Sequence, residues 1–257
     1  MSIGILNLPE ELLDVILGCL LPRLNPYLQL DHNIRYRLPK DLLQCRLTCR
    51  TLYRIASPWL CRRFDLLETY SPSVDCFEKK RKQFLAKVTF FSTREENAGA
   101  VRLLHLDRRH IPEFQEIFSP LFTTQPQFFS CMSNLQILVL KYCRISDICG
   151  AVVFAQILKQ PKLHTVVLQG VDGMDWSCVR DPLFNLKNMD IGYMFSTGAP
   201  LSLAPCLETL SLRSCELENP HESTSIPWGT MRQLRINSPN GLKVVLESYE
   251  VNLHCVI

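Results

Sequence analysis

The chain has 257 residues, with 28 Lys or Arg against 25 Asp or Glu and a formal charge of +3. The whole excess of positive charge lies in the first 67 residues. The remaining residues are neutral overall and lack the excess of basic residues that is typical of a nucleic-acid-binding domain. The twelve cysteines follow no secretory segment, which favours free thiols in the cytoplasm or nucleus. No run approaches the ~18 apolar residues of a membrane span, so we expect no membrane partner.

Residues 8–20 predict a helix with more apolar surface than one buried face needs. Pro9 suits a first helical turn, and Glu10 and Glu11 follow where the amide dipoles favour negative charge. At helical spacing the apolar side chains cover about 200°, whereas a core-facing stripe needs little more than about 100°. They are Leu12, Leu13, Val15, Ile16, Leu17, Cys19 and Leu20. The surplus indicates that a partner protein covers part of this helix.

Two stretches of the chain together form one recognisable pattern. The first contains Leu8, Pro9, Leu12, Leu13, Ile16 and Leu20, and the second contains Thr48, Cys49, Arg50 and Tyr53. This pattern resembles the F-box, a three-helix module, in its fungal form. In the second stretch the family usually has a small hydroxyl residue, a cysteine, a basic residue and an aromatic residue in this order. Tyr53 replaces the more usual tryptophan, and residues 21–40 form a longer insertion than the family's ordinary loop.

The resemblance implies that this module binds a Skp-type adaptor and, through it, the cullin of a ubiquitin ligase. The residues that it implies for adaptor binding are Leu8, Pro9, Leu12, Ile16 and Leu20, with Leu43, Leu47 and Leu52 as further candidates. The alternative is an ordinary helical domain whose leucines form only their own core.

From residue 101 the chain repeats a leucine-rich template. The clearest copies are Leu135-x-x-Leu138-x-Leu140-x-x-Cys143 and Leu207-x-x-Leu210-x-Leu212-x-x-Cys215. Weaker copies begin at residues 101, 163, 186 and 231, and most spacings match the about 20–29 residues of leucine-rich repeats. Alternating leucines point inward from short strands, and each repeat covers its neighbour. We therefore expect an α/β fold: a curved parallel sheet with helices or irregular returns on its convex side.

The predicted organisation has three parts. Residues 1–66 form the F-box with its insertion, residues 67–100 form a linker and an entry strand, and residues 101–257 form the repeats. Leu85, Val88 and Phe90 are the expected entry strand. The ladder of repeats reaches the last residues without a polar closing segment, so a terminal cap is either made by residues 242–257 or missing.

Side chains that alternate with the inward leucines are expected on the concave face of the sheet. Apolar and aromatic residues on an otherwise polar face favour protein recognition. The candidate target-binding residues are Val139, Tyr142, Val167, Asp190, Tyr193, Arg213 and Arg235. The alternative is that these are ordinary exposed residues.

No motif for catalysis, phosphate binding or metal binding occurs in the sequence. The six histidines are scattered, and no Walker loop, G-x-S-x-G elbow or C-x-x-C pair is present. We therefore expect a protein that is not an enzyme and needs no cofactor or metal. The leading hypothesis is a substrate-recognition subunit of a Skp–cullin–F-box ligase with an unidentified target protein. A repeat scaffold or inhibitor without a role in ubiquitin transfer is the alternative.

Overall fold

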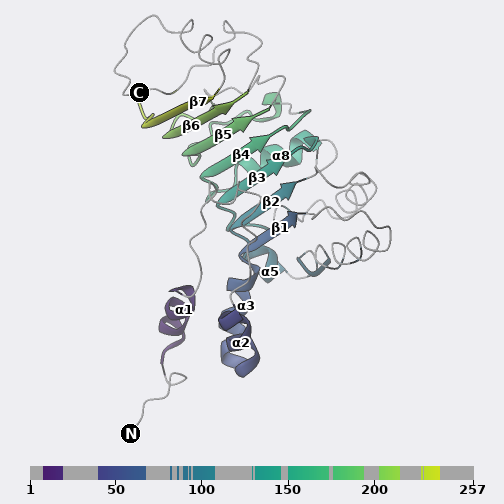
Figure 1. Ribbon diagram of the computed structural model, residues 1–257, viewed down its shortest axis with the longest axis vertical. Coiled ribbons are helices and arrows are strands. Elements are labelled where there is room, and N and C mark those ends of the chain that lie inside the picture. Colours follow the sequence, from purple (N-terminus) through teal and green to yellow (C-terminus); the bar gives the residue numbers. More distant parts are fainter. Residues whose placement is uncertain are drawn as a thin grey trace, which may run out of the picture.

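The computed structural model is an α/β protein whose sheet contains seven parallel strands in sequence order. It describes residues 8–19, 40–67, 82, 86, 89–91, 93, 95–107, 129, 131–145, 150–173, 176–193, 203–214, 227 and 229–237. Figure 1 shows the strands following one another along the long axis of the molecule, with helices α1 to α3 beyond β1. This solenoid-like order confirms the predicted α/β class with a parallel sheet.

The strands are all five residues long. They are β1 (Arg63–Leu67), β2 (Leu103–Asp107), β3 (Ile137–Lys141), β4 (Thr165–Gln169), β5 (Asn188–Gly192), β6 (Thr209–Arg213) and β7 (Gln233–Asn237). Each strand pairs with the next without a shift in register, for example Leu138 with Val166 and Val167 with Asp190. Equivalent residues of successive repeats therefore form continuous rows across the sheet.

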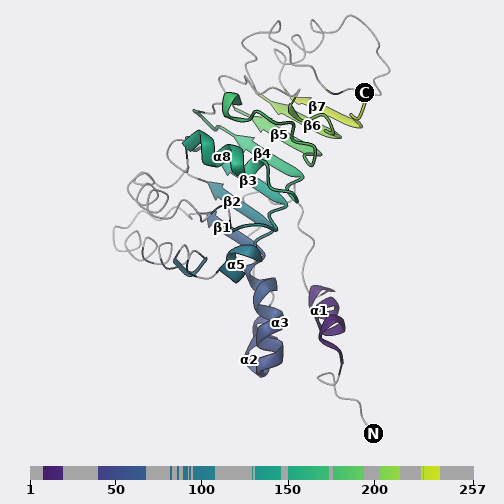
Figure 2. The ribbon, with the colours of Figure 1, turned by 180° about the vertical axis from the view of Figure 1, so that it is seen from behind.

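The main core lies on one face of the sheet. It contains the alternating apolar side chains of successive strands, such as Leu104, Leu138 and Val166, each less than 2% exposed. Helix α8 (Gly150–Leu158) covers this face, as Figure 2 shows, and contributes Phe154 and Leu158 to the core. The 3-10 turn η2 (Trp176–Cys178) lies against α8, where the Trp176 and Phe154 rings meet edge to face.

The three helices before the sheet form a small module with its own core. They are α1 (Glu10–Cys19), α2 (Lys40–Thr48) and α3 (Arg50–Cys61). Its buried side chains are Leu13, Leu17, Leu42, Leu52, Ile55 and Ala56. The extended backbone of Cys49 separates α2 from α3, and its sulfur accepts the Leu52 N–H at 3.5 Å as an N-cap. We call α1 to α3 the helical module.

The sheet begins earlier in the chain than the sequence predicted. Its first strand is β1, and α5 (Glu95–Gly99) precedes β2. The expected entry strand is wrong at Phe90, because residues 89–91 are helical. Phe91 packs edge to face on Phe64 of β1, with ring centroids 4.6 Å apart. This segment therefore packs on the first strand instead of forming it. Leu85 and Val88 lie outside the described residues.

Candidate protein-interaction surfaces

Helix α1 has two apolar stripes, of which only one is buried. Leu13 and Leu17 are 1% and 4% exposed and pack into the core of the helical module. On the other side Leu12, Val15 and Ile16 are 51%, 62% and 40% exposed. We call these three residues the outer stripe of α1. An apolar stripe of this size on a short helix is a typical protein-binding surface.

The residues proposed for adaptor binding do not all lie on that stripe. Leu8 is half-buried against the helical core, whereas Pro9 is exposed and its carbonyl accepts the N–H groups of Leu12 and Leu13 at 3.1 Å. Leu12 and Ile16 belong to the outer stripe. Leu20 lies outside the described residues.

The second group of adaptor candidates is divided in the same way. Leu43 is half-buried and Leu47 is 78% exposed on α2. The prediction that Leu52 contacts the adaptor is wrong. Leu52 is 8% exposed and packs with Leu42 and Ile55 inside the module, so it has little surface that a partner could contact. The same distribution identifies Val15 as a surface residue that the family pattern did not single out.

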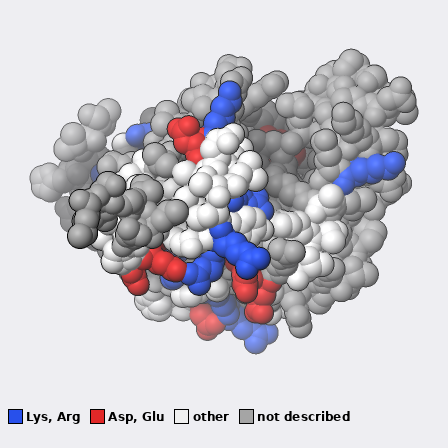
Figure 3. All heavy atoms as spheres, turned by 90° about the horizontal axis from the view of Figure 1, so that it is seen from below, with Lys and Arg blue, Asp and Glu red and all other residues white. Residues whose placement is uncertain are grey.

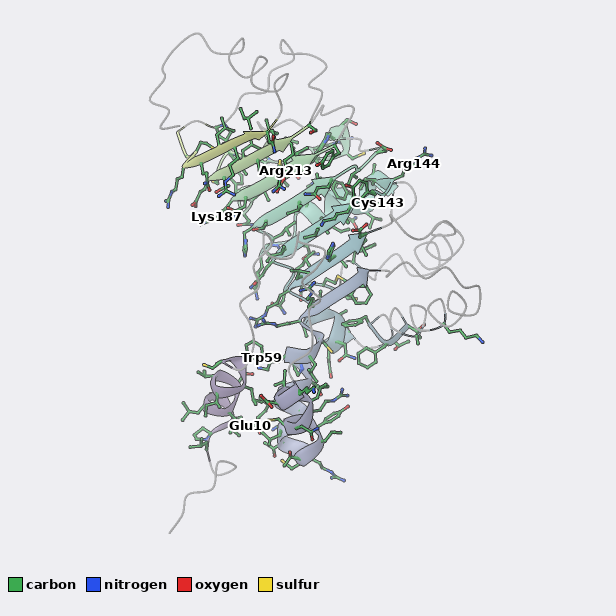
Figure 4. All side chains as sticks on the ribbon, in the orientation of Figure 1. Glu10, Trp59, Cys143, Arg144, Lys187 and Arg213 are labelled. Carbon is green, nitrogen blue, oxygen red and sulfur yellow. The ribbon has the colours of Figure 1, made fainter. Side chains whose placement is uncertain are left out.

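Trp59 of α3 holds α1 in place. Its indole Nε1 donates a hydrogen bond to Asp14 Oδ1 at 2.6 Å. Its ring lies over Gly18, where an added Cβ would come within 3.0 Å of the ring. An ion pair between Glu10 and Arg54 adds a second link between the two helices. Figure 4 shows Glu10 and Trp59 between α1 and α3.

The helical module continues into the sheet without a linker. Arg62 alone separates α3 from β1, and its carbonyl accepts the N–H groups of Arg102 and Leu103 at 2.7 and 3.0 Å. The Arg102 guanidinium lies 5.0 Å from the centroid of the Trp59 ring, which is a cation–π distance. The outer stripe of α1 is therefore fixed relative to the sheet through Trp59.

Charges on the helical module are mixed in sign. Viewed from the end of the molecule that α2 and α3 form, basic and acidic side chains lie interspersed (Figure 3). Arg46 lies over the Tyr53 ring at 4.7 Å and donates to its hydroxyl, so part of the basic charge is used within the module. This arrangement suits a protein surface better than a nucleic-acid surface, which needs a continuous basic patch.

The second face of the sheet, opposite the main core, carries the target-binding candidates. Strand register aligns His105, Val139, Val167, Asp190, Ser211 and Arg235 in one row. The prediction that Val139 and Val167 are exposed is wrong, since each is only 1% exposed. They pack with Leu103 and Ile137 as a separate apolar cluster, because β-branched and leucine side chains from adjacent strands cover one another.

Asp190 is also buried, at 1% exposed, and forms an ion pair with Arg213, whose Nη2 lies 2.8 Å from Oδ2. Burial raises the pKa of the Asp190 carboxyl above its ordinary value, and the guanidinium of Arg213 opposes this shift. Ser211 also lowers the pKa by hydrogen bonding, and Lys141 lowers it through its charge. The carboxylate therefore belongs to an internal charge cluster.

The residue that follows each of four strands has a left-handed backbone. These exit residues are Tyr142, Gly170, Tyr193 and Ser214, with φ of 51°, 58°, 55° and 47°. Each donates its N–H to the last carbonyl of the next strand, as Tyr193 does to Arg213 at 2.8 Å. Sequence reasoning missed this requirement because tyrosine is a poor indicator of positive φ. The Tyr142 ring lies over Gly170, whereas Tyr193 is 51% exposed.

Comparisons of the chain with protein-family models, with curated proteins and with solved structures gave no match. Within the described part of the chain, no three His, Cys, Asp or Glu side chains are grouped so that they could hold a metal ion. No helix among those residues is long and apolar enough to cross a membrane.

Proposed function

We propose that the chain is the substrate-recognition subunit of a Skp–cullin–F-box ubiquitin ligase. The helical module acts as the F-box and binds a Skp-type adaptor through the outer stripe of α1. The observation that carries the proposal is the division of α1 into a buried stripe, Leu13 and Leu17, and an exposed apolar stripe on its other side. When a partner covers exposed leucine, isoleucine and valine side chains on one helix, burial of their apolar surface makes the free energy of binding more favourable.

The repeats hold the target protein in this proposal. Six strands in sequence order, β2 to β7, follow the leucine template, which supports a leucine-rich-repeat domain. The protein makes no covalent bond itself. It raises the local concentration of the target near a ubiquitin-charged enzyme, which is a proximity mechanism. Direct continuity of α3 and β1 favours this role, because it fixes the distance between the adaptor surface and the sheet.

The test is capture of a purified Skp-type adaptor by the full chain. A double substitution of the outer stripe, Leu12→Ser with Ile16→Ser, removes apolar contact area without touching the buried stripe. We expect capture to fall at least about tenfold, since loss of well-covered interface residues has this effect. Val152→Ser is the matched control, because Val152 is 65% exposed on α8, which packs on the main core and not on the helical module.

Circular dichroism must show that the double variant stays folded. Unchanged capture by a folded double variant, or no capture by the wild-type chain, would contradict the proposal. A chain that captures no adaptor but retains a protein partner through the sheet is the scaffold or inhibitor of the alternative hypothesis. Deleting residues 1–66 is a poor way to separate the two, because it removes Phe64 and most of β1 from the sheet.

A further inference from the structure

The second face of the sheet is closed to a partner over β2, β3 and β4, where every residue is buried. A protein that binds this part of the chain must therefore use another surface. The residues that directly precede the strands β2 to β7 offer one, because they are all half-buried or exposed. We call these six residues the entry row: Arg102, Gln136, His164, Lys187, Glu208 and Arg232.

The backbone arranges the entry row as one continuous line across the sheet. Each member donates its N–H to the carbonyl of the member before it, as Gln136 does to Arg102 at 2.8 Å and Arg232 does to Glu208 at 2.8 Å. Neighbouring strands lie about 4.8 Å apart, so the line is about 24 Å long. Figure 4 shows Lys187 at the ends where the strands begin. A single extended ligand can therefore contact several repeats at once.

Two cations at the starts of β2 and β4 have no carboxylate partner among the described residues. The Arg102 guanidinium lies 5.0 Å from the centroid of the Trp59 ring. Lys162, two positions before His164, is exposed and donates to the amide oxygen of Asn134. An aromatic ring and an amide oxygen neutralise neither charge, so both cations can still attract an anion.

The far half of the entry row has two cations for one carboxylate. Glu208 Oε1 lies 3.1 Å from Lys187 Nζ, and its Oε2 lies 3.5 Å from Arg232 Nε. The side chains of Lys187 and Arg232 are 56% and 78% exposed, so both reach solvent. When Arg102 and Lys162 are included, four basic side chains stand against one carboxylate in this described part of the chain.

His164 does not add to this charge at neutral pH. Its burial and the charge of Lys187 lower its pKa below the ordinary value, so its imidazole is neutral there. Its Nδ1 lies 2.8 Å from Thr165 Oγ1. The excess of positive charge therefore comes from lysine and arginine, which stay charged throughout the neutral range.

The carboxylate of Glu208 favours a protein partner over a nucleic acid. A polynucleotide carries a negative charge at every phosphate and would bring some of them close to Glu208. A protein segment can place acidic residues against Arg102 and Lys162 and a neutral residue against Glu208. An extended chain rises about 3.4 Å per residue, so acidic residues about three positions apart match the distance between two alternate strands.

We propose that the entry row, with Lys162 beside it, binds an extended acidic segment of a target protein. The segment lies across the starts of the strands, and its Asp or Glu side chains form charge-assisted hydrogen bonds with Arg102, Lys162 and Lys187. That the bound protein is a ubiquitination target rests on the proposed function. Binding of the segment itself does not.

The test uses fluorescein-labelled dodecamer peptides and the purified full chain. One peptide has a glutamate at every third position in a glycine–serine background, and a second has glutamine at the same positions. By fluorescence anisotropy at low ionic strength we expect the glutamate peptide to bind at least about tenfold more tightly, and added salt to weaken its binding. A thymidine pentanucleotide, whose phosphodiester groups match the charge of the glutamate peptide, should bind no more tightly than that peptide. Equal binding of the two peptides, or tighter binding of the pentanucleotide, would overturn the proposal.

Two variants with opposite expected effects locate the binding. Lys162→Glu should weaken binding of the glutamate peptide about fivefold, and Glu208→Gln should strengthen it about threefold, because the first removes net positive charge and the second adds it. A gain of affinity does not come from a misfolded chain. Arg144→Glu is the matched control, because Arg144 is exposed at the other ends of the strands (Figure 4). Unchanged affinity in either variant, or a loss in the control as large as that in Lys162→Glu, would show that the entry row is not the site.

Adaptor capture by the same variants separates this inference from the proposed function. Lys162→Glu and Glu208→Gln should capture the Skp-type adaptor as the wild-type chain does, since they precede β4 and β6, whereas α1 lies beyond β1 (Figure 1). Selective peptide binding without adaptor capture would support the entry row as a binding site and refute the ligase role. Adaptor capture without peptide selectivity would do the reverse.

Discussion

The indole of Trp59 and the carboxylate of Asp14 form a 2.6 Å hydrogen bond between residues 45 positions apart. This bond joins α3 to α1, and the same ring contacts the Arg102 guanidinium next to β2. A single side chain therefore connects the proposed adaptor surface with the first repeats. The geometry makes Trp59 a positioning residue, because its effect on a partner acts through α1.

Trp59→Phe should destabilise the helical module by about 1 kcal/mol, because it removes the hydrogen bond to Asp14 at a partly exposed site. Urea denaturation would measure the loss. Asp14→Asn keeps an acceptor oxygen at the same place and should have a smaller effect. Equal losses in the two variants would show that the bond stabilises the module only when its acceptor is charged.

The two stripes of α1 should respond differently to truncation. Leu17→Ala should lower the free energy of unfolding by about 2–5 kcal/mol, because Leu17 is 4% exposed within the helical core. Leu12→Ala should change it by no more than about 0.5 kcal/mol, since Leu12 is half-exposed. Urea denaturation of both variants checks the difference. A large loss of stability in Leu12→Ala would mean that the outer stripe is internal packing.

Gly170→Ala is expected to destabilise the fold for two separable reasons. Its φ of 58° is strained for alanine by about 1 kcal/mol, and an added Cβ would lie 2.8 Å from Tyr142 Cδ1. Gly173 has a φ of 69° with nothing within 4 Å of an added Cβ, so Gly173→Ala isolates the backbone strain. Thermal denaturation should show the larger loss for Gly170→Ala. Equal losses would mean that the Tyr142 ring moves aside freely.

Stability should depend on pH through Asp190. Burial raises the pKa of this carboxyl above 3.8, its ordinary value, despite Arg213, Ser211 and Lys141 beside it. The folded chain therefore holds this proton more tightly than the unfolded chain, and the group contributes less stability as the pH rises from 3.8 through the folded-state pKa. The free energy of unfolding of the wild type minus that of Asp190→Asn should fall over that interval. Urea titrations that show it rising would contradict the assignment.

The repeat pattern predicted the sheet because it depends on local alternation. Leu138 and Leu140 face the core on β3, as Leu210 and Leu212 do on β6, since side chains of a strand alternate between its two faces. The same alternation correctly placed Val139, Val167 and Asp190 on the other face of the sheet, where the strand register aligns them in one row. Period and register are properties of nearby residues, so a single sequence is enough to predict them.

Features that depend on distant packing were not predictable in this way. Burial of Val139 and Val167 depends on what covers the second face, and no local pattern reports that. Strand β1 was missed because its alternation around Phe64 is short and follows a helix directly. Tyr142 and Tyr193 have positive φ angles, which tyrosine seldom adopts. The residue type therefore gave no indication of these backbone conformations. On α1, however, the surplus of apolar surface was predictable from the helical spacing of its apolar residues, which is a local pattern.

The junction at Arg62 also limits how this protein can be recombined with others. Because β1 follows α3 directly, a hybrid that takes only residues 1–62 from this chain would lack β1, and the first strand of the incoming sheet would have an unpaired edge, which favours aggregation. A graft joined after Leu67 would carry the strand with the helices and give the incoming domain a ready template for its first repeat. Replacement of the sheet by that of another protein should therefore succeed only downstream of Leu67.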